Sequence, residues 1–198
     1  MARPRTTSDE AILHAAARAL GGLGPARLTL SAVAREAGLA PATLVQRFGS
    51  KRGLLLALAR QAEPGARLHF QRARAEHAGG AGPLEAMKAA LAGMAAAVRT
   101  PEEMANNLAF LQLDLADPEF REPAAAHART VGREIAGLLE QAIAAGALTA
   151  GTDTAALARA VQITYNGVLI LWALDGDGDL VQGLREDLDR LLAPYRTA

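Results

Sequence analysis

Four neighbouring side chains have types and spacing that suit contacts with a nucleic acid, and they are Ala42, Thr43, Gln46 and Arg47. They fall outside the apolar face of a short predicted helix, on which Leu44 and Phe48 lie one turn apart. A glutamine can pair with an adenine edge in the major groove, and an arginine can hold a phosphate. Gln46 could equally contact only a phosphate or a water molecule.

These residues belong to the second of two short helices that the sequence predicts between Leu28 and Leu55. The first helix begins at Thr29, whose hydroxyl can cap its first turn, and it ends at Gly38, which tolerates a positive φ. Pro41 fits the first turn of the second helix, where its missing N–H costs nothing. Two helices joined by so short a turn form a helix-turn-helix, whose second helix enters the DNA major groove.

A longer helix is predicted from Ser50 to about Ala78, with an interruption near Glu63–Gly65. Lys51 lies in its first turn, where a cation opposes the helix dipole, so a nearby phosphate would account for it. Because this helix joins the helix-turn-helix to the remaining chain, we expect it to connect the two mechanically.

The charge distribution supports contact with phosphates in the first third of the chain. The whole chain is neutral, with 21 basic and 21 acidic residues. Residues 1–60 nevertheless hold nine lysines and arginines against three acidic residues, and the remainder carries the opposite imbalance. The pattern predicts a phosphate-binding head on an acidic body, although chance clustering of surface charge is the alternative. The basic arm at residues 1–8 could add a DNA contact or could simply fray.

A specific pattern extends over the first sixty residues. It consists of Ile12, Leu13, Ala15, Ala16 and Leu20, the Gly24 turn, Thr29, the block AREAGLAPATL, and Phe48, Ser50, Lys51, Leu54 and Leu55. On these residues the segment resembles the N-terminal domain of TetR-family transcriptional regulators. The resemblance implies that Thr29 and Lys51 contact phosphates and that the recognition surface includes or adjoins Thr43, Gln46 and Arg47.

The chain departs from this family at three positions of the recognition helix. Val45 stands where the family commonly has tyrosine, Arg47 where it has histidine, and Ala40 where it has serine. Val45 removes a hydroxyl that would bind a phosphate, while Arg47 could restore charge to the same backbone. We therefore expect an operator that is read differently from those of better-matched relatives.

The rest of the sequence predicts helices throughout. Their approximate ranges are 10–21 before the helix-turn-helix, and 83–98, 101–116, 122–146, 154–174 and 180–192 after it. The resulting fold class is all-α, with a three-helix head at residues 1–52 and a helical body at residues 53–198 for effector binding and dimerisation.

A polar and aromatic stripe on the predicted helix 154–174 suits a small-molecule site. Its members recur every three or four positions, and they are Gln162, Tyr165, Asn166, Leu169 and Trp172. Four residues from other helices complete the candidate set, namely Met104, Asn107, Phe110 and His127. Together they could line an apolar pocket with a few hydrogen-bonding groups. The alternative is that Tyr165 and Trp172 fill the core and Asn166 satisfies a helix end or a dimer contact.

The last two predicted helices expose more apolar surface than a monomer of 198 residues can readily cover. Two copies that pack these helices as a four-helix bundle would cover it, and the resemblance implies the same arrangement. The alternative is a larger monomeric core.

Several classes of chemistry lack support in the sequence. There is no cysteine, no HExxH and no glycine-rich phosphate loop, so we expect no metal, no cofactor and no enzyme activity. The DGDGD run at 175–179 lacks the glycine that an EF-hand needs at position 6, and Asp179 is interpreted as a helix cap. Without a secretory signal or a membrane-length run of uncharged apolar residues, the expected location is the cytoplasm and no membrane partner is expected.

The sequence as a whole predicts a ligand-responsive, DNA-binding transcriptional regulator. We expect a repressor that a small apolar or amphipathic effector releases from a double-stranded DNA operator. One alternative is a helical ligand-binding or enzymatic protein with a vestigial head, and another is an architectural DNA binder without an effector.

Overall fold

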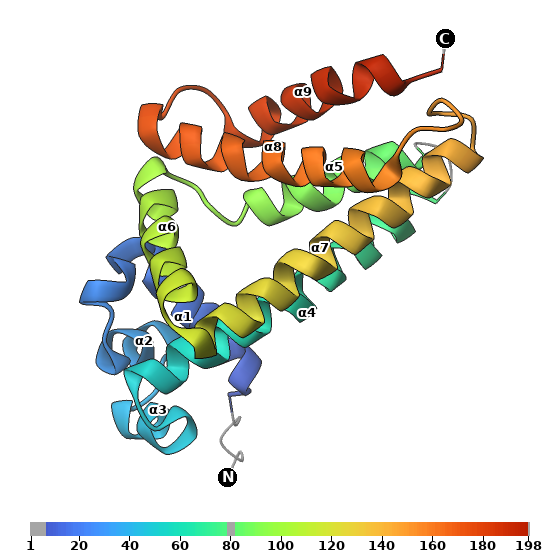
Figure 1. Ribbon diagram of the computed structural model, residues 1–198. Coiled ribbons are helices and arrows are strands. Elements are labelled where there is room, and N and C mark those ends of the chain that lie inside the picture. Colours follow the sequence, from blue (N-terminus) through green and yellow to red (C-terminus); the bar gives the residue numbers. More distant parts are fainter. Residues whose placement is uncertain (1–6, 79–81, 198) are drawn as a thin grey trace. The chain divides into compact units, whose positions relative to one another are not determined.

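The computed structural model describes residues 7–78 and 82–197, and these contain nine α-helices and no β-strand (Figure 1). The helices are α1 (Asp9–Arg27), α2 (Leu30–Ala37), α3 (Pro41–Phe48), α4 (Lys51–His77), α5 (Gly82–Ala95), α6 (Pro101–Ala116), α7 (Pro118–Ala144), α8 (Thr154–Asp175) and α9 (Leu180–Leu192). The all-α fold class is therefore confirmed.

Contacts divide the chain into two compact units. The head comprises residues 1–62 and 102–124, and the body comprises residues 63–101 and 125–198. The boundary between the units falls inside α4 and α7 and at the start of α6. The predicted assignment of roles to residues 1–52 and 53–198 stays a prediction.

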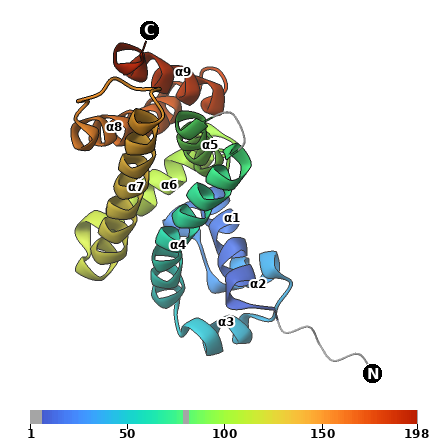
Figure 2. The ribbon, with the colours of Figure 1, turned by 90° about the vertical axis from the view of Figure 1, so that its right-hand side faces the viewer.

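The head forms around one apolar core. Its fully buried side chains include Ile12, Leu28, Leu44, Leu54 and Phe120. Figure 2 shows α1, α2 and α3 gathered at the start of α4, and α6 and the first turns of α7 complete the same core. Distant parts of the sequence thus supply one core, which is why the head extends beyond the first sixty residues.

The helix-turn-helix has the caps that its sequence predicts. The Thr29 hydroxyl accepts a hydrogen bond from the Ala32 N–H at 3.1 Å, and Gly38 ends α2 with φ 66°. Pro41 opens α3, and Leu44 is fully buried. Both helix boundaries are therefore confirmed.

Helix α1 is longer than predicted because its break at Gly24 is followed by further helix. Gly24 has φ 71°, and Pro25 starts the short helical segment that continues to Arg27. The Asn106 side-chain amide donates to the Gly21 carbonyl at 2.6 Å. A Cβ at position 24 would lie 2.5 Å from the Asn106 oxygen, so both the conformation and the contact with α6 require glycine.

Two further predictions of helix bounds were wrong. Helix α4 runs without interruption through Pro64, although a proline inside a helix costs about 3 kcal/mol. Buried side chains lie on both sides of it, at Ala59 and Phe70. Helix α7 begins at Pro118 and not near residue 122. The Asp117 carboxylate accepts from the Glu119 N–H at 3.0 Å, so Asp117–Pro118 starts a new helix immediately after α6 ends.

In the body, the end of α4 and most of α7 run side by side in the same direction. The Thr130 hydroxyl donates to Glu63 at 3.0 Å, and Arg74 bonds Glu134 at 2.5 Å. These two contacts connect the helices at separate levels and set their register.

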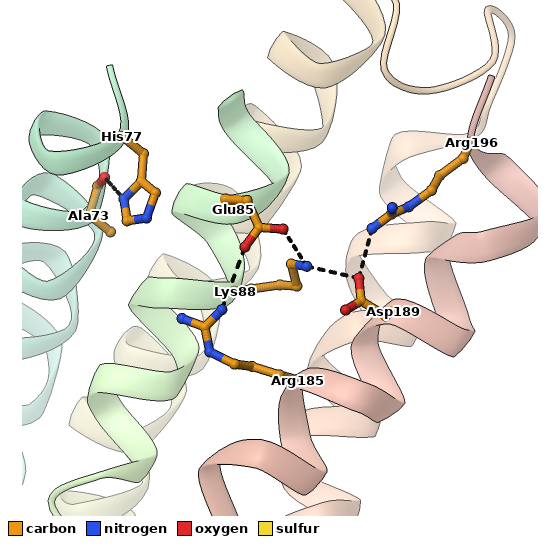
Figure 3. Close-up of polar contacts among 7 residues, drawn as sticks. All are labelled: Ala73, His77, Glu85, Lys88, Arg185, Asp189 and Arg196. Carbon is orange, nitrogen blue, oxygen red and sulfur yellow. Dashed lines mark hydrogen bonds and ion pairs between the residues drawn. The ribbon is translucent and has the colours of Figure 1, made fainter. Parts of the chain in front are cut away.

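A buried lysine fixes α9 to α5 (Figure 3). Lys88 is only 4% exposed, and its ammonium bonds Asp189 of α9 at 2.8 Å and Glu85 of its own helix. Arg185 approaches Glu85 at 3.5 Å, and Arg196 bonds Asp189 at 2.7 Å. Because the buried Lys88 ammonium pairs with a carboxylate from each of the two helices, this cluster holds α9 at one position on α5.

The caps of α2 and α3 give a paired test of helix stability. Ala40 caps α3 without a side-chain hydrogen bond, whereas Thr29 caps α2 with one. We expect Thr29→Ala to lower the free energy of unfolding by about 1 kcal/mol and Ala40→Ser to raise it by a similar amount. Urea unfolding followed by circular dichroism measures both changes.

The matched control is Ala42→Ser, which makes the same substitution two residues later, inside α3. Serine has a lower helix propensity than alanine, so this variant should lose about 0.5 kcal/mol. If Ala40→Ser and Ala42→Ser had the same effect, the interpretation of Ala40 as an incomplete cap would be wrong.

Candidate functional site

Helix α3 has one face directed into the head and one face open. Leu44 is fully buried and Phe48 is half-buried against the same core. The exposed residues are Pro41, Ala42, Val45 and Gln46. Val45 is 51% exposed, although the neighbouring Leu44 is fully buried. The open face of α3 is therefore mainly apolar, with one amide.

Arg47 binds within the head. Its guanidinium donates to the Thr7 carbonyl at 2.5 Å and to the Asp9 carboxylate at 2.9 Å, and its side chain is 23% exposed. These bonds tie α3 to the start of α1. The predicted role of Arg47 in binding DNA stays a prediction. In this structure its guanidinium is used for contacts inside the head.

Thr29 and Lys51 lie at the edges of the helix-turn-helix and keep some bonding capacity. The exposed Thr29 hydroxyl accepts from a backbone N–H and still has its own proton to donate. The Lys51 ammonium donates to the Ala26 carbonyl at 3.1 Å, which uses one of its three donors. Both groups can therefore donate to a phosphate oxygen without breaking a bond of the head. Thr43, the remaining member of the predicted DNA-binding set, is half-buried.

Arg52, the neighbour of Lys51, has a structural role. It bonds Asp117 and Glu119, both at 2.5 Å, and its guanidinium lies 5.1 Å from the centre of the Phe120 ring. The hydrogen bonds of Arg52 lower the pKa of Asp117, while the two carboxylates raise the pKa of Arg52. These contacts join the start of α4 to the junction of α6 and α7 and neutralise the Arg52 charge.

Internal pairing also reduces the basic character that the sequence predicts for the head. Arg18 bonds Glu36 at 2.8 Å, in addition to the pairs that hold Arg47 and Arg52. Arg27 and Arg35 are exposed on and beside α2. The charge excess near the helix-turn-helix is therefore smaller than the count of basic residues implies. The predicted contribution of the arm falls largely on residues 1–6, outside the described residues.

The predicted ligand-binding residues divide between the two units. Met104, Asn107 and Phe110 lie on α6 in the head, and the other six lie in the body. Met104 is buried and Asn107 is half-buried. Phe110 packs edge-on against Phe120, with ring centres 6.1 Å apart, and both rings contribute to the core of the head.

On α8 most polar members of the predicted stripe have structural partners. The Gln162 amide donates to the Ala128 carbonyl of α7 at 2.9 Å, and the Asn166 amide donates to the Gln162 carbonyl at 2.9 Å. The Trp172 indole donates to the Gly178 carbonyl at 3.2 Å. Burial raises the pKa of Tyr165 to about 12, so its phenol remains a hydrogen-bond donor at neutral pH. The two remaining members of the set in the body lie on α7 and α8, where His127 is half-buried and Leu169 is buried.

The body also contains an open cavity of about 340 Å³ that none of the predicted residues lines. Its walls are Arg74, His77, Ala78, Gly82, Pro83, Ala86, Leu138 and Gln141. They come from α4, the start of α5 and α7, so no single helical period in the sequence indicates them. In the described part of the chain no three acidic or histidine side chains form a metal cluster. Asp179 caps α9 by accepting from the Gln182 N–H at 2.8 Å, as predicted.

Asp114 of α6 is a half-buried carboxyl that the sequence did not predict as a site. One of its oxygens is buried and has no hydrogen-bond partner among the described residues. This burial raises the pKa of Asp114 to about 6. The position gives little signal in the sequence, because exposed and buried aspartates look alike on a helix with several apolar faces.

Comparisons with known proteins agree with this geometry. Residues 12–58 match the family model described as bacterial regulatory proteins of the tetR family, and residues 107–188 match a tetracyclin repressor-like C-terminal domain. A search of curated proteins found no match.

Three solved structures are similar over nearly the whole chain. A putative TetR-family regulator from Rhodococcus sp. is 25% identical, with 96% of this chain and 98% of that chain covered and a TM-score of 0.70. SmeT, the repressor of the Stenotrophomonas maltophilia multidrug efflux pump SmeDEF, is 22% identical, with coverage of 97% and 92% and a TM-score of 0.66. A TetR transcription regulator from Haloarcula marismortui is 17% identical, with coverage of 96% and 98% and a TM-score of 0.76.

The pKa of Asp114 predicts how stability depends on pH. With a folded-state pKa of about 6, above its ordinary value, the folded protein binds more protons than the unfolded chain between about pH 4 and pH 6. Stability contributed by this group therefore falls as pH rises through that window. We expect Asp114→Asn to be more stable than the wild type above pH 6 and the advantage to shrink towards pH 4.

Urea unfolding at several pH values measures this difference. The control is Asp175→Asn, which removes one charge from an exposed helix end. A difference between Asp114→Asn and the wild type that stays constant from pH 4 to pH 7 would contradict the assignment.

Proposed function

The chain belongs to the TetR family of bacterial regulatory proteins, and we propose that it acts as a homodimeric repressor which a small apolar or amphipathic effector releases from its operator. As a family member, it is a ligand-responsive, DNA-binding transcriptional regulator. Regulators of this family are soluble cytoplasmic proteins and are typically not enzymes. The observation that carries the proposal is the open face of α3 within a helix-turn-helix whose two helices begin and end where the sequence predicts.

The proposed contact surface combines positioning groups with base-reading groups. Thr29 and Lys51 keep donors for phosphates, and such contacts orient a recognition helix on the duplex. Ala42 and Gln46 are exposed on α3, where they would meet base edges. The head has its own apolar core and a capped α2, which argues against a vestigial head.

The proposed dimer rests on α8. Four apolar side chains at helical spacing are exposed on it, and they are Ile163 at 59%, Ile170 at 42%, Leu171 at 60% and Leu174 at 79%. Helix α9 lies beside α8 (Figure 1). The four side chains of this stripe stay exposed even so. A second copy would cover the stripe and form a four-helix bundle from α8 and α9 of both protomers. A two-fold of this kind would place two recognition helices about one DNA turn apart.

By length and composition alone, α8 could also cross a membrane. From the sequence we expect no membrane-spanning segment. A single helix of this kind is weak evidence for insertion, because helices that pack inside soluble proteins have the same composition. We therefore assign the apolar surface of α8 to the second protomer.

The proposed switch is a shift between two populations. An effector that binds the body better in one state would favour that state, and α4 would transmit the change because it belongs to both units. All three chain crossings between the units lie within two residues of a proline, namely Pro64, Pro101 and Pro123. A proline removes one backbone hydrogen bond, so α4 and α7 are weakened at the points where the head would move.

Salt dependence tests the phosphate contacts. Binding to a mixed-sequence duplex of about 30 base pairs should weaken steeply between about 50 and 200 mM salt. We expect Lys51→Ala to reduce the slope of log affinity against log salt by about 0.9 per bound protomer. Fluorescence anisotropy of labelled DNA measures the slope.

The matched control is Arg60→Ala, which removes an exposed cation from the same helix, further from the helix-turn-helix. It should leave the slope unchanged. Equal effects of the two variants would mean that Lys51 contributes only to net charge, and the absence of any salt-dependent binding would contradict the proposed function.

The dimer has its own test. Leu171→Glu places a charge in the proposed interface and should raise the dimer dissociation constant at least tenfold, which corresponds to about 1.4 kcal/mol. Sedimentation velocity measures the dissociation constant. Leu115→Glu on α6, at a leucine that is 64% exposed, is the control and should leave the dimer intact. A monomeric wild type would contradict the proposal.

A further inference from the structure

The open face of α3 offers almost no hydrogen-bonding capacity. Pro41 lacks an N–H, and the side chains of Ala42 and Val45 have no polar atom. Gln46 supplies the single polar side chain of this face. An exposed valine cannot bind a phosphate, so its exposure suits contact with an apolar group of the DNA.

Ala42, Val45 and Gln46 form one continuous patch. Val45 and Gln46 lie three and four residues after Ala42 on a regular helix, which places each of their Cβ atoms about 5–6 Å from that of Ala42. Successive base pairs are separated by about 3.4 Å, so the patch spans about two base-pair steps. Contacts made by these side chains would therefore fall on adjacent base pairs.

The positive charge of Arg47 does not lie on the open face of α3. The Arg47 guanidinium donates to Thr7 and Asp9, at the start of α1. Within the described residues, α3 therefore presents no cation beside Gln46 on its exposed face. The guanine edge in the major groove offers two acceptors, and arginine or lysine is its usual partner. A surface of this composition does not match guanine.

The same surface does match A·T pairs. Thymine presents a methyl group in the major groove, which apolar side chains contact. Adenine presents one acceptor and one donor, which a glutamine amide can bind in a bidentate manner.

We propose that α3 recognises adjacent A·T base pairs, with Ala42 and Val45 packed on thymine methyl groups and Gln46 paired with adenine. The inference rests on the proposed function, because it requires α3 to enter the major groove. It adds the chemical class of the base pairs that this recognition helix selects.

The experiment uses DNA that the wild-type protein selects from a random duplex library. Each thymine of the enriched site is replaced in turn by uracil, which keeps the hydrogen-bonding edge and removes only the methyl group. At one or two positions of each half-site we expect uracil to weaken binding about fourfold, the effect of losing one buried methyl group. Thymines outside these positions are internal controls and should tolerate uracil.

Val45→Ala identifies the side chain responsible. If Val45 contacts a thymine methyl group, this variant should weaken binding to thymine-containing DNA and be insensitive to uracil at that one position. The coupling between protein and DNA changes separates a direct contact from a general loss of affinity. Because Val45 is exposed and the uracil series uses the wild-type protein, the test does not depend on the stability of the variant.

Gln46→Ala provides the second arm and should relax the preference for adenine beside the uracil-sensitive positions. Enriched half-sites with G·C pairs opposite α3, or sites that tolerate uracil at every position, would overturn this inference and leave the proposed function intact. Failure to bind or enrich any DNA would overturn both.

Discussion

The orientation of α3 depends on the burial of Leu44. An eight-residue helix has little stability by itself, so its position comes from what it packs against. Leu44 is its one fully buried side chain, and the bonds from Arg47 to Thr7 and Asp9 hold the next turn to α1. Once these two residues face inwards, helical geometry directs Ala42, Val45 and Gln46 outwards. The surface available to DNA follows from these internal contacts.

The rest of the head supports this arrangement from distant parts of the chain. Arg52 joins α4 to Asp117 and Glu119, and Phe120 completes the apolar core from α7. Asn106 binds the α1 backbone at Gly21, next to the break at Gly24. Residues from α6 and α7, far along the sequence, thus stabilise the head that carries the helix-turn-helix.

Local sequence signals predicted several helices well. They could not predict which side chains pair across long stretches of sequence. Caps at Thr29 and Asp179 and the positive φ at Gly38 depend on neighbours within a few residues, so α2, α3 and α9 were predicted accurately. The partner of Arg47 lies 38 residues away, and those of Arg52 lie 65 and 67 residues away. A helical period cannot show whether an arginine on a favourable face is already paired. For the same reason it could not show that the Gln162 amide of α8 donates to α7.

In the proposed complex, two heads bind one operator through a two-fold axis. The most direct measurement determines the number of protomers bound and the spacing of half-sites on DNA that the protein selects. We expect two protomers on an inverted repeat, with half-site centres about 10 base pairs apart or a multiple of that distance. One protomer bound to an unrepeated site would contradict it.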